Sequence, residues 1–112
     1  MLIYKIMPQP NLEVFKRSGR FTGLGIDLTD GYIHFSTAEQ VKETASKHFY
    51  SQENLALVWT EANSLGKKLK WELSRGNNQF PHLYRHWCYD EVLGSSKLPW
   101  KNLKHEFPEF LQ

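Results

Sequence analysis

His34 and Ser36 carry side chains whose types and spacing suit the binding of an anion. They are separated by one residue and lie just ahead of a segment with helical periodicity. An extended strand would place both side chains on one face, and the free N–H groups at the start of a helix favour a phosphate. Alternatively, His34 is a hydrogen-bonded core histidine and Ser36 only caps the helix, and the spacing leaves both interpretations open.

Glu72 lies between Trp71 and Leu73 in a segment that alternates between polar and apolar residues. A carboxylate on a half-buried strand face can stabilise positive charge that develops on a sugar, as glycosyl transfer requires. The alternative is a solvated face residue, paired with a neighbour such as Lys70. Alternation alone does not separate these two interpretations.

His82 and Tyr84 flank Leu83 after a proline. The imidazole titrates near neutral pH and the phenol can stack on a ring, although both also suit structural hydrogen bonds. We expect His34, Glu72 and His82 to converge on one cleft. These three residues lack the local spacing that is typical of metal ligands, so no metal is predicted.

The elements that must position these side chains follow from periodicity, caps and turn residues. Strands are expected over residues 2–6, 31–37, 54–60 and 69–73, and a weaker one over 89–93. One helix is expected between Asn11 and Gly19, and a second from the capping-box residues 36–39 to about residue 49. The turn-rich segment 23–31 is expected to be a loop, 80–84 a loop or the start of a strand, and the tail 97–112 irregular.

These elements indicate one α+β domain over residues 1–112, with its core in about residues 2–95. A formal net charge of +2 gives no strong field for a nucleic acid or a membrane, and scattered lysines leave RNA only a weak option as a partner. No apolar run is long enough to span a bilayer, and the single cysteine, Cys88, fits a reducing compartment. A cytoplasmic protein without a membrane partner is therefore expected.

Four segments match, in order, the motifs of a known family: IYKI at 3–6, DLTDGYIHFSTAEQV at 27–41, WELSRG at 71–76 and FPHLY at 80–84. With these segments the chain resembles the domain-of-unknown-function 952 family. That family is similar in outline to the ADP-ribosyltransferase fold, in which two small, packed, mostly antiparallel sheets with two or three helices hold NAD, and to the RNA 2′-phosphotransferases that use NAD. The resemblance therefore implies a nucleotide ligand, with NAD as the cofactor, and the transfer of ADP-ribose or of a terminal phosphate.

The resemblance also implies a set of site residues. It implies a pocket formed by Lys5, by the step Phe35-Ser36-Thr37 and by Glu72, and together with the strand analysis it leads us to expect Glu72 and His34 to be catalytic. The first-strand position that is usually His in active transferases is here Lys5. The remaining residues expected to bind substrate or cofactor are Tyr32, Phe35, Ser36, Thr37, Arg75, His82 and Tyr84. The same cleft in a non-catalytic module that binds a nucleotide or another small molecule is the alternative.

Overall fold

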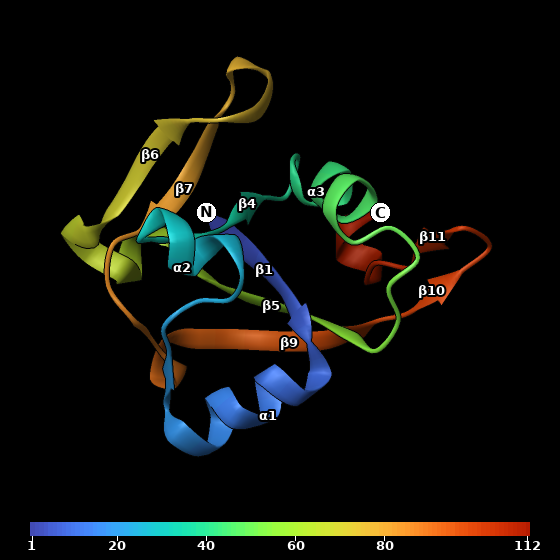
Figure 1. Cartoon of the computed structure of the whole chain (residues 1–112), viewed down its shortest axis with the longest axis horizontal. Helices are drawn as coiled ribbons and strands as arrows, with labels where there is room; N and C mark the ends of the chain where they lie inside the picture. The colour runs from blue at the N-terminus through green and yellow to red at the C-terminus, as the bar shows by residue number, and fades with distance from the viewer.

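The structure is a computed structural model that describes residues 1–112, apart from the side chain of Arg75. Its largest element is a four-stranded antiparallel sheet that runs across the centre of the molecule (Figure 1). In spatial order the strands are β4 (Ser36–Thr37), β1 (Leu2–Pro8), β5 (Leu55–Glu61) and β9 (Val92–Leu98). The α+β class expected from the sequence is confirmed by this arrangement of antiparallel sheets and helices.

Both faces of the four-stranded sheet are covered, which explains why β5 is an almost continuous apolar run. On one face, Ile3, Met7 and Val58 pack with the helix α1 (Gln9–Ser18). On the other face, Tyr4 and Leu57 belong to a second apolar cluster, which also includes residues from the helix α3 (Val41–His48) and from the C-terminal segment. The four-stranded sheet therefore has a buried apolar cluster on each face.

A separate three-stranded antiparallel sheet carries most of the polar residues singled out above. Its order is β3 (Ile33–His34), β7 (Gln79–Leu83) and β6 (Leu69–Leu73). β6 and β7 extend as a hairpin away from the larger sheet (Figure 1). The short helix α2 (Ile26–Asp30) precedes β3 and lies in a segment that was expected to be a loop.

The strand expected over residues 31–37 is divided at Phe35, and its halves belong to different sheets. β3 pairs with β7, whereas β4 pairs with β1. The Phe35 N–H donates to the Pro81 carbonyl oxygen at 3.0 Å, and the Phe35 ring is buried with its centroid 4.9 Å from that of Trp87. Burial of this large ring in the core accounts for the break, because a continuous strand would hold both halves in one sheet.

The helix after β4 begins later than its capping-box pattern predicted. α3 starts at Val41, and the Thr37 N–H donates to the Gln40 side-chain oxygen at 3.0 Å. Ser36 does not cap the helix, because it lies in β4 with its hydroxyl 2.9 Å from that of Thr44. The capping expectation failed because pairing of β4 with β1 fixes the backbone of residues 36 and 37 as a strand.

The C-terminal segment, expected to be irregular, contains regular elements. Residues 89–91 form a 3₁₀ turn and the last long strand, β9, continues to Leu98. A hairpin of two short strands and a final 3₁₀ turn follow, and Phe107 and Leu111 enter the second apolar cluster. Burial of these two apolar residues supplies the free energy that orders the segment. The remaining short elements are β2 (Arg20–Phe21), β8 (Trp87–Cys88), β10 (Trp100–Lys101), β11 (Lys104–His105), η1 (Ala62–Lys68), η2 (Arg75–Asn77), η3 (Tyr89–Glu91) and η4 (Glu109–Leu111).

No helix in the described part of the chain is both long and apolar enough to cross a membrane.

Candidate functional site

The register of the three-stranded sheet places four polar side chains on one face. His34 lies opposite His82, His82 lies opposite Lys70, and Glu72 lies opposite Phe80. Residues directly opposite in antiparallel strands, and residues two apart in one strand, share a face. His34, His82, Lys70 and Glu72 therefore look to the same side, with the strand that carries His82 between the other two.

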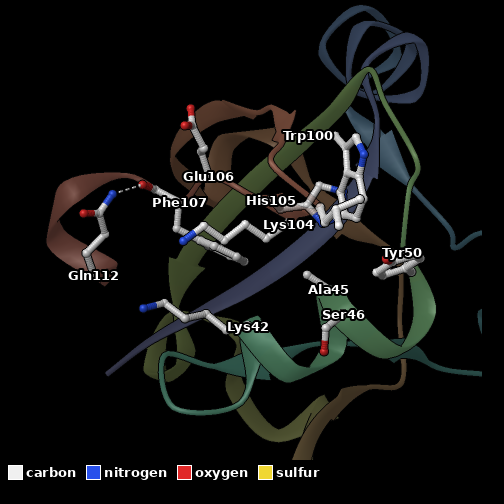
Figure 2. Close-up of a pocket in the computed structure, with 11 residues that line it drawn as sticks. Lys42, Ala45, Ser46, Tyr50, Trp100, Lys104, His105, Glu106, Phe107 and Gln112 are labelled. Atoms are coloured by element: carbon white, nitrogen blue, oxygen red, sulfur yellow. Dashed lines mark hydrogen bonds between the residues drawn. The ribbon is translucent and has the colours of Figure 1, made fainter.

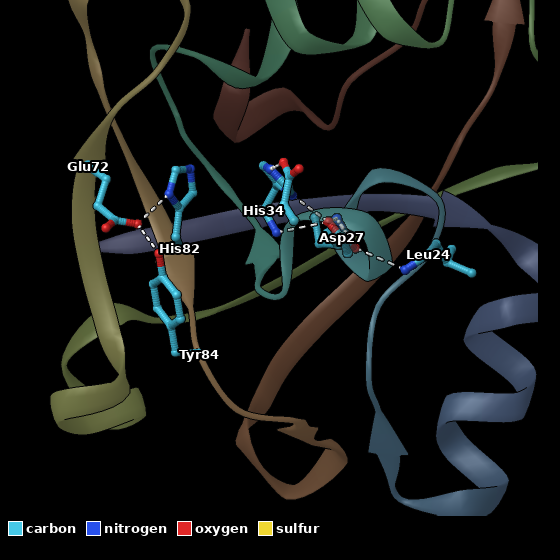
Figure 3. Close-up of polar contacts among 8 residues, drawn as sticks. Leu24, Asp27, His34, Glu72, His82 and Tyr84 are labelled. Atoms are coloured by element: carbon cyan, nitrogen blue, oxygen red, sulfur yellow. Dashed lines mark hydrogen bonds and ion pairs between the residues drawn. The ribbon is translucent and has the colours of Figure 1, made fainter.

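Glu72 is held by two hydrogen bonds at one carboxylate oxygen. His82 Nδ1 donates to Glu72 Oε1 at 2.9 Å, and the Tyr84 hydroxyl donates to the same oxygen at 2.6 Å (Figure 3). These two bonds, the one from Tyr84 first, lower the pKa of Glu72, and the bond to Glu72 raises the pKa of Tyr84 to about 12. The Glu72 side chain is 39% exposed, so it presents an oriented, ionised carboxylate to the solvent.

His82 is buried and orients Glu72 through its hydrogen bond. Burial lowers its pKa, which keeps the ring neutral with the proton on the nitrogen that faces Glu72. Its other nitrogen, Nε2, is buried and has no hydrogen-bond partner among the described residues. The Tyr32 ring stacks on His82 with a centroid separation of 4.2 Å and lies 5.0 Å from the ring of Tyr84. The Tyr32 ring thus packs against His82 and Tyr84, the two residues that hold the Glu72 carboxylate.

Asp27 is the buried centre of a second polar network, and no role was predicted for it. Its Oδ1 accepts hydrogen bonds from His34 Nδ1 at 2.6 Å and from the His34 backbone N–H at 3.0 Å, and its Oδ2 accepts from the Leu24 N–H at 3.0 Å (Figure 3). Lys5 Nζ lies 2.8 Å from Asp27 Oδ2. Asp27 therefore joins β1 of the larger sheet to β3 of the smaller one.

His34 lies between two carboxylates. Its Nε2 is 3.0 Å from Asp30 Oδ2, while its Nδ1 contacts Asp27, and the carboxylate oxygens can only accept in these contacts. The ring is 5.2 Å from that of His82 and 4.6 Å from that of Tyr32, by centroids. His34 is thus oriented at both nitrogens and stands beside the Glu72 group, joined to it through Tyr32 and His82.

The charge state of Asp27 makes the stability of the fold depend on pH. Burial alone would raise its pKa, but the hydrogen bond from His34 and the charge and hydrogen bond of Lys5 lower the pKa to about 2. Burial also lowers the pKa of Lys5, opposed by Asp27. A group whose folded-state pKa is depressed stabilises the fold above its unfolded-state pKa, and this contribution is lost as the pH falls through the folded value.

We therefore expect about 2 kcal/mol of the free energy of unfolding to be lost between about pH 4 and pH 2 through Asp27. Urea denaturation at pH 5, 3 and 2 measures it. The Asp27→Asn variant cannot titrate at this position, so its stability should fall less over the same interval. An equal fall in the two proteins would contradict the assignment.

The structure brings some of the predicted site residues together and separates others. His34, Tyr32, Glu72, His82 and Tyr84 form the cluster described above. Three predicted residues lie elsewhere, in the core or towards α3, and these are Phe35, Ser36 and Thr37. The Arg75 side chain lies outside the described residues. The binding roles of all these residues stay predictions.

Lys5 and Asp27 form an ion pair that the sequence analysis did not predict. Lys5 is buried and bound to Asp27, so its ammonium is already engaged within the fold. Asp27 was visible in the sequence as the first residue of the DLTDGYIHFSTA segment. Nothing local indicated its importance, because its partner on β1 is 22 residues away in sequence. Among the described side chains, no group of three or more His, Cys, Asp or Glu residues is arranged to hold a metal ion.

Comparison with known proteins agrees with this arrangement of motifs. A family model described as "Protein of unknown function (DUF952)" matches residues 6–95, which is most of the chain. The chain belongs to the DUF952 family. This family match includes all of the strands that form the site except the start of β1.

Solved structures resemble the chain over nearly its whole length. The crystal structure of protein CC0527 from Caulobacter crescentus is 44% identical in sequence, covers 99% of this chain and 98% of its own, and has a TM-score of 0.94. The solution NMR structure of CC0527 is 46% identical, covers 93% of this chain and 90% of its own, and has a TM-score of 0.83. None of the curated proteins compared with this DUF952 chain matches it.

Proposed function

We propose that the polar face of the β3–β7–β6 sheet binds a nucleotide, with NAD as the ligand, and that the domain transfers ADP-ribose from it. The observation that carries this proposal is the state of Glu72: ionised, fixed by His82 and Tyr84, and open to solvent. A fixed carboxylate of this kind stabilises positive charge that develops in a transition state more effectively than a mobile one. The similarity in outline between the DUF952 family and the ADP-ribosyltransferase fold, noted from the sequence, is a further reason for the proposal.

The available side chains fit such a ligand in their chemistry. Bound NAD supplies a ribose whose bond to nicotinamide breaks, with the electron pair leaving on the nicotinamide nitrogen. Glu72 would face the positive charge that develops on the ribose carbon, while the oxygen of an acceptor hydroxyl would form the new bond and release its proton to solvent. Tyr32 offers an aromatic surface for the nicotinamide ring, and His34 is proposed to exchange the exposed contact of its Nε2 with Asp30 for a hydrogen bond to ribose or phosphate. Arg75 is proposed to pair with the pyrophosphate.

A second candidate function is a binding module without catalysis, and Lys5 is the observation that favours it. In active transferases the first-strand residue, usually His, holds a ribose hydroxyl, but here Lys5 is buried against Asp27. A flexible ammonium in an internal ion pair does not replace an imidazole in geometry. In this alternative, Glu72 and His82 supply only hydrogen bonds to a bound nucleotide or other small molecule.

Incubation of the protein with labelled NAD separates the two candidates. We expect NAD to raise the melting temperature, as a ligand that prefers the folded state must, and we expect free nicotinamide to accumulate with time. Binding without release of nicotinamide would support the non-catalytic module. If NAD neither binds to the protein nor releases nicotinamide, the proposal of an NAD site is wrong.

A further inference from the structure

A hollow lies between α3 and the β10–β11 hairpin, away from the proposed NAD site. Its volume is about 710 Å³, within the usual range for sites that hold small molecules. Ala45 and Ser46 of α3 form one wall, and Phe107 forms part of the other (Figure 2). We call it the α3 groove, and none of the residues that line it belongs to the β3–β7–β6 sheet.

Two aromatic residues at one end of the α3 groove are not accounted for by the core. Tyr50 is 56% exposed, and its ring lies 4.9 Å from that of Trp100 by centroids, at an interplanar angle of 77°. Trp100 is in turn 4.9 Å from His105. Neither Tyr50 nor Trp100 belongs to the two apolar core clusters. Trp100 is partly buried and Tyr50 is exposed, and aromatic rings that line a hollow are typical of surfaces on which a planar ligand stacks.

Two lysines in the same groove lack an anionic partner. Lys42 and Lys104 line the groove, and neither forms an ion pair with the described residues, whereas the nearby Lys47 and Lys101 are paired with carboxylates at 3.4 and 3.7 Å. In Figure 2 both ammonium groups point towards the end of the groove away from Tyr50 and Trp100. Glu106 also lines the groove, but its carboxylate is paired with Lys101 at 3.7 Å. An anion placed between Lys42 and Lys104 therefore faces two lysines without ion-pair partners among the described residues and lowers the repulsion between them.

We propose that the α3 groove binds a nucleotide, with its base on Tyr50 and Trp100 and its phosphate between Lys42 and Lys104. A nucleotide carries a planar ring and an anionic group on one short frame, which matches the two ends of the groove in chemistry. The ligand is either a free mononucleotide or a terminal nucleotide of single-stranded RNA, because both present this combination. The proposal does not rest on the NAD site.

The groove is tested by NMR titration of the ¹⁵N-labelled chain with AMP, adenosine, inorganic phosphate and a short oligoadenylate. We expect AMP to bind more tightly than adenosine or phosphate alone, with shift changes concentrated in α3 and the β10–β11 hairpin. A markedly tighter oligoadenylate identifies RNA as the source, and equal affinity identifies the free nucleotide. No shift changes in the groove with either AMP or oligoadenylate would overturn the proposal.

Matched lysine variants keep the test specific. The double variant Lys42→Ala/Lys104→Ala removes two exposed charges, and we expect AMP affinity to fall on the order of tenfold. The control Lys67→Ala/Lys68→Ala removes the same charge from exposed positions outside the groove and should leave the affinity unchanged. If both double variants lose AMP affinity equally, the loss reflects net charge alone and the proposed site is wrong. Glu72→Gln should not change the groove shifts, so failure of the NAD site and failure of the groove are read separately.

Discussion

Replacement of Asp27 by asparagine is expected to lower the free energy of unfolding by about 3–5 kcal/mol, because it leaves a buried lysine charge without a partner. The Asp27 side chain is 1% exposed and that of Lys5 11%, so water can replace the lost carboxylate only in small part. Asparagine also loses the charge that holds His34 Nδ1 at 2.6 Å. For a domain of this size the melting temperature should fall by roughly 10–20 °C, measured by circular dichroism.

Two further variants separate the buried charge from general damage to the segment. Asp30→Asn changes a neighbouring carboxylate that also contacts His34 but is partly exposed, and should cost less than about 1 kcal/mol. The double variant Lys5→Met/Asp27→Asn removes both charges but keeps an oxygen that can accept from the Leu24 or the His34 N–H group, and should be more stable than Asp27→Asn alone because no unpaired ion remains in the interior. An Asp27→Asn protein as stable as Asp30→Asn would show that the ion pair contributes little.

Replacement of Glu72 by glutamine is expected to slow the release of nicotinamide from NAD by roughly 10²–10³-fold if the proposed transfer occurs. Glutamine keeps the shape of the side chain and an oxygen that accepts from His82 and Tyr84, but it carries no negative charge to face the ribose. The fold should be unaffected, since the side chain is partly exposed. Single-turnover measurement of free nicotinamide, together with NAD affinity, separates loss of chemistry from loss of binding.

A chemically matched control for this variant is Glu13→Gln on α1. Glu13 is exposed and lies 3.6 Å from Lys16, in a surface pair away from the β3–β7–β6 sheet. Its replacement should leave nicotinamide release within about twofold of the wild-type rate, because removing one exposed charge has little effect at a distance. If Glu72→Gln retains the wild-type rate, the carboxylate does not act on the ribose; if it changes affinity alone, Glu72 belongs to a binding module.

The part of the site that could be predicted from the sequence is the part governed by strand alternation. His34 follows the core residue Ile33, so it points to the opposite face of its strand. Both neighbours of Glu72 point to the face opposite to that of Glu72. The period of two therefore assigns each residue a face without reference to the rest of the chain. His82 and Tyr84 were singled out by their residue types after Pro81, and both contact Glu72. The same rule places Lys70, two residues before Glu72, on the same face.

What could not be predicted depends on contacts between distant segments. The ion pair of Asp27 with Lys5 joins a short helix to the first strand, and no local pattern reveals such a partner. The division at Phe35 and the late start of α3 result from pairing of β4 with β1 and from burial of an aromatic ring. The ordered C-terminal hairpin depends on apolar residues that reach a cluster formed largely by earlier strands. Local propensity is weak compared with these tertiary effects.

The division at Phe35 limits how the molecule can respond to a ligand. Phe35 alone connects β3, which carries His34, to β4 at the edge of the four-stranded sheet. At this connection, a rotation of the three-stranded sheet against the four-stranded one must change the backbone torsion angles of Phe35. Its ring is wedged against Trp87 with 2% of its surface exposed, and turning it would open a void in the core. Closure over a bound molecule therefore has to come from bending of the projecting β6–β7 arm, which carries Glu72, rather than from a swing of one sheet against the other.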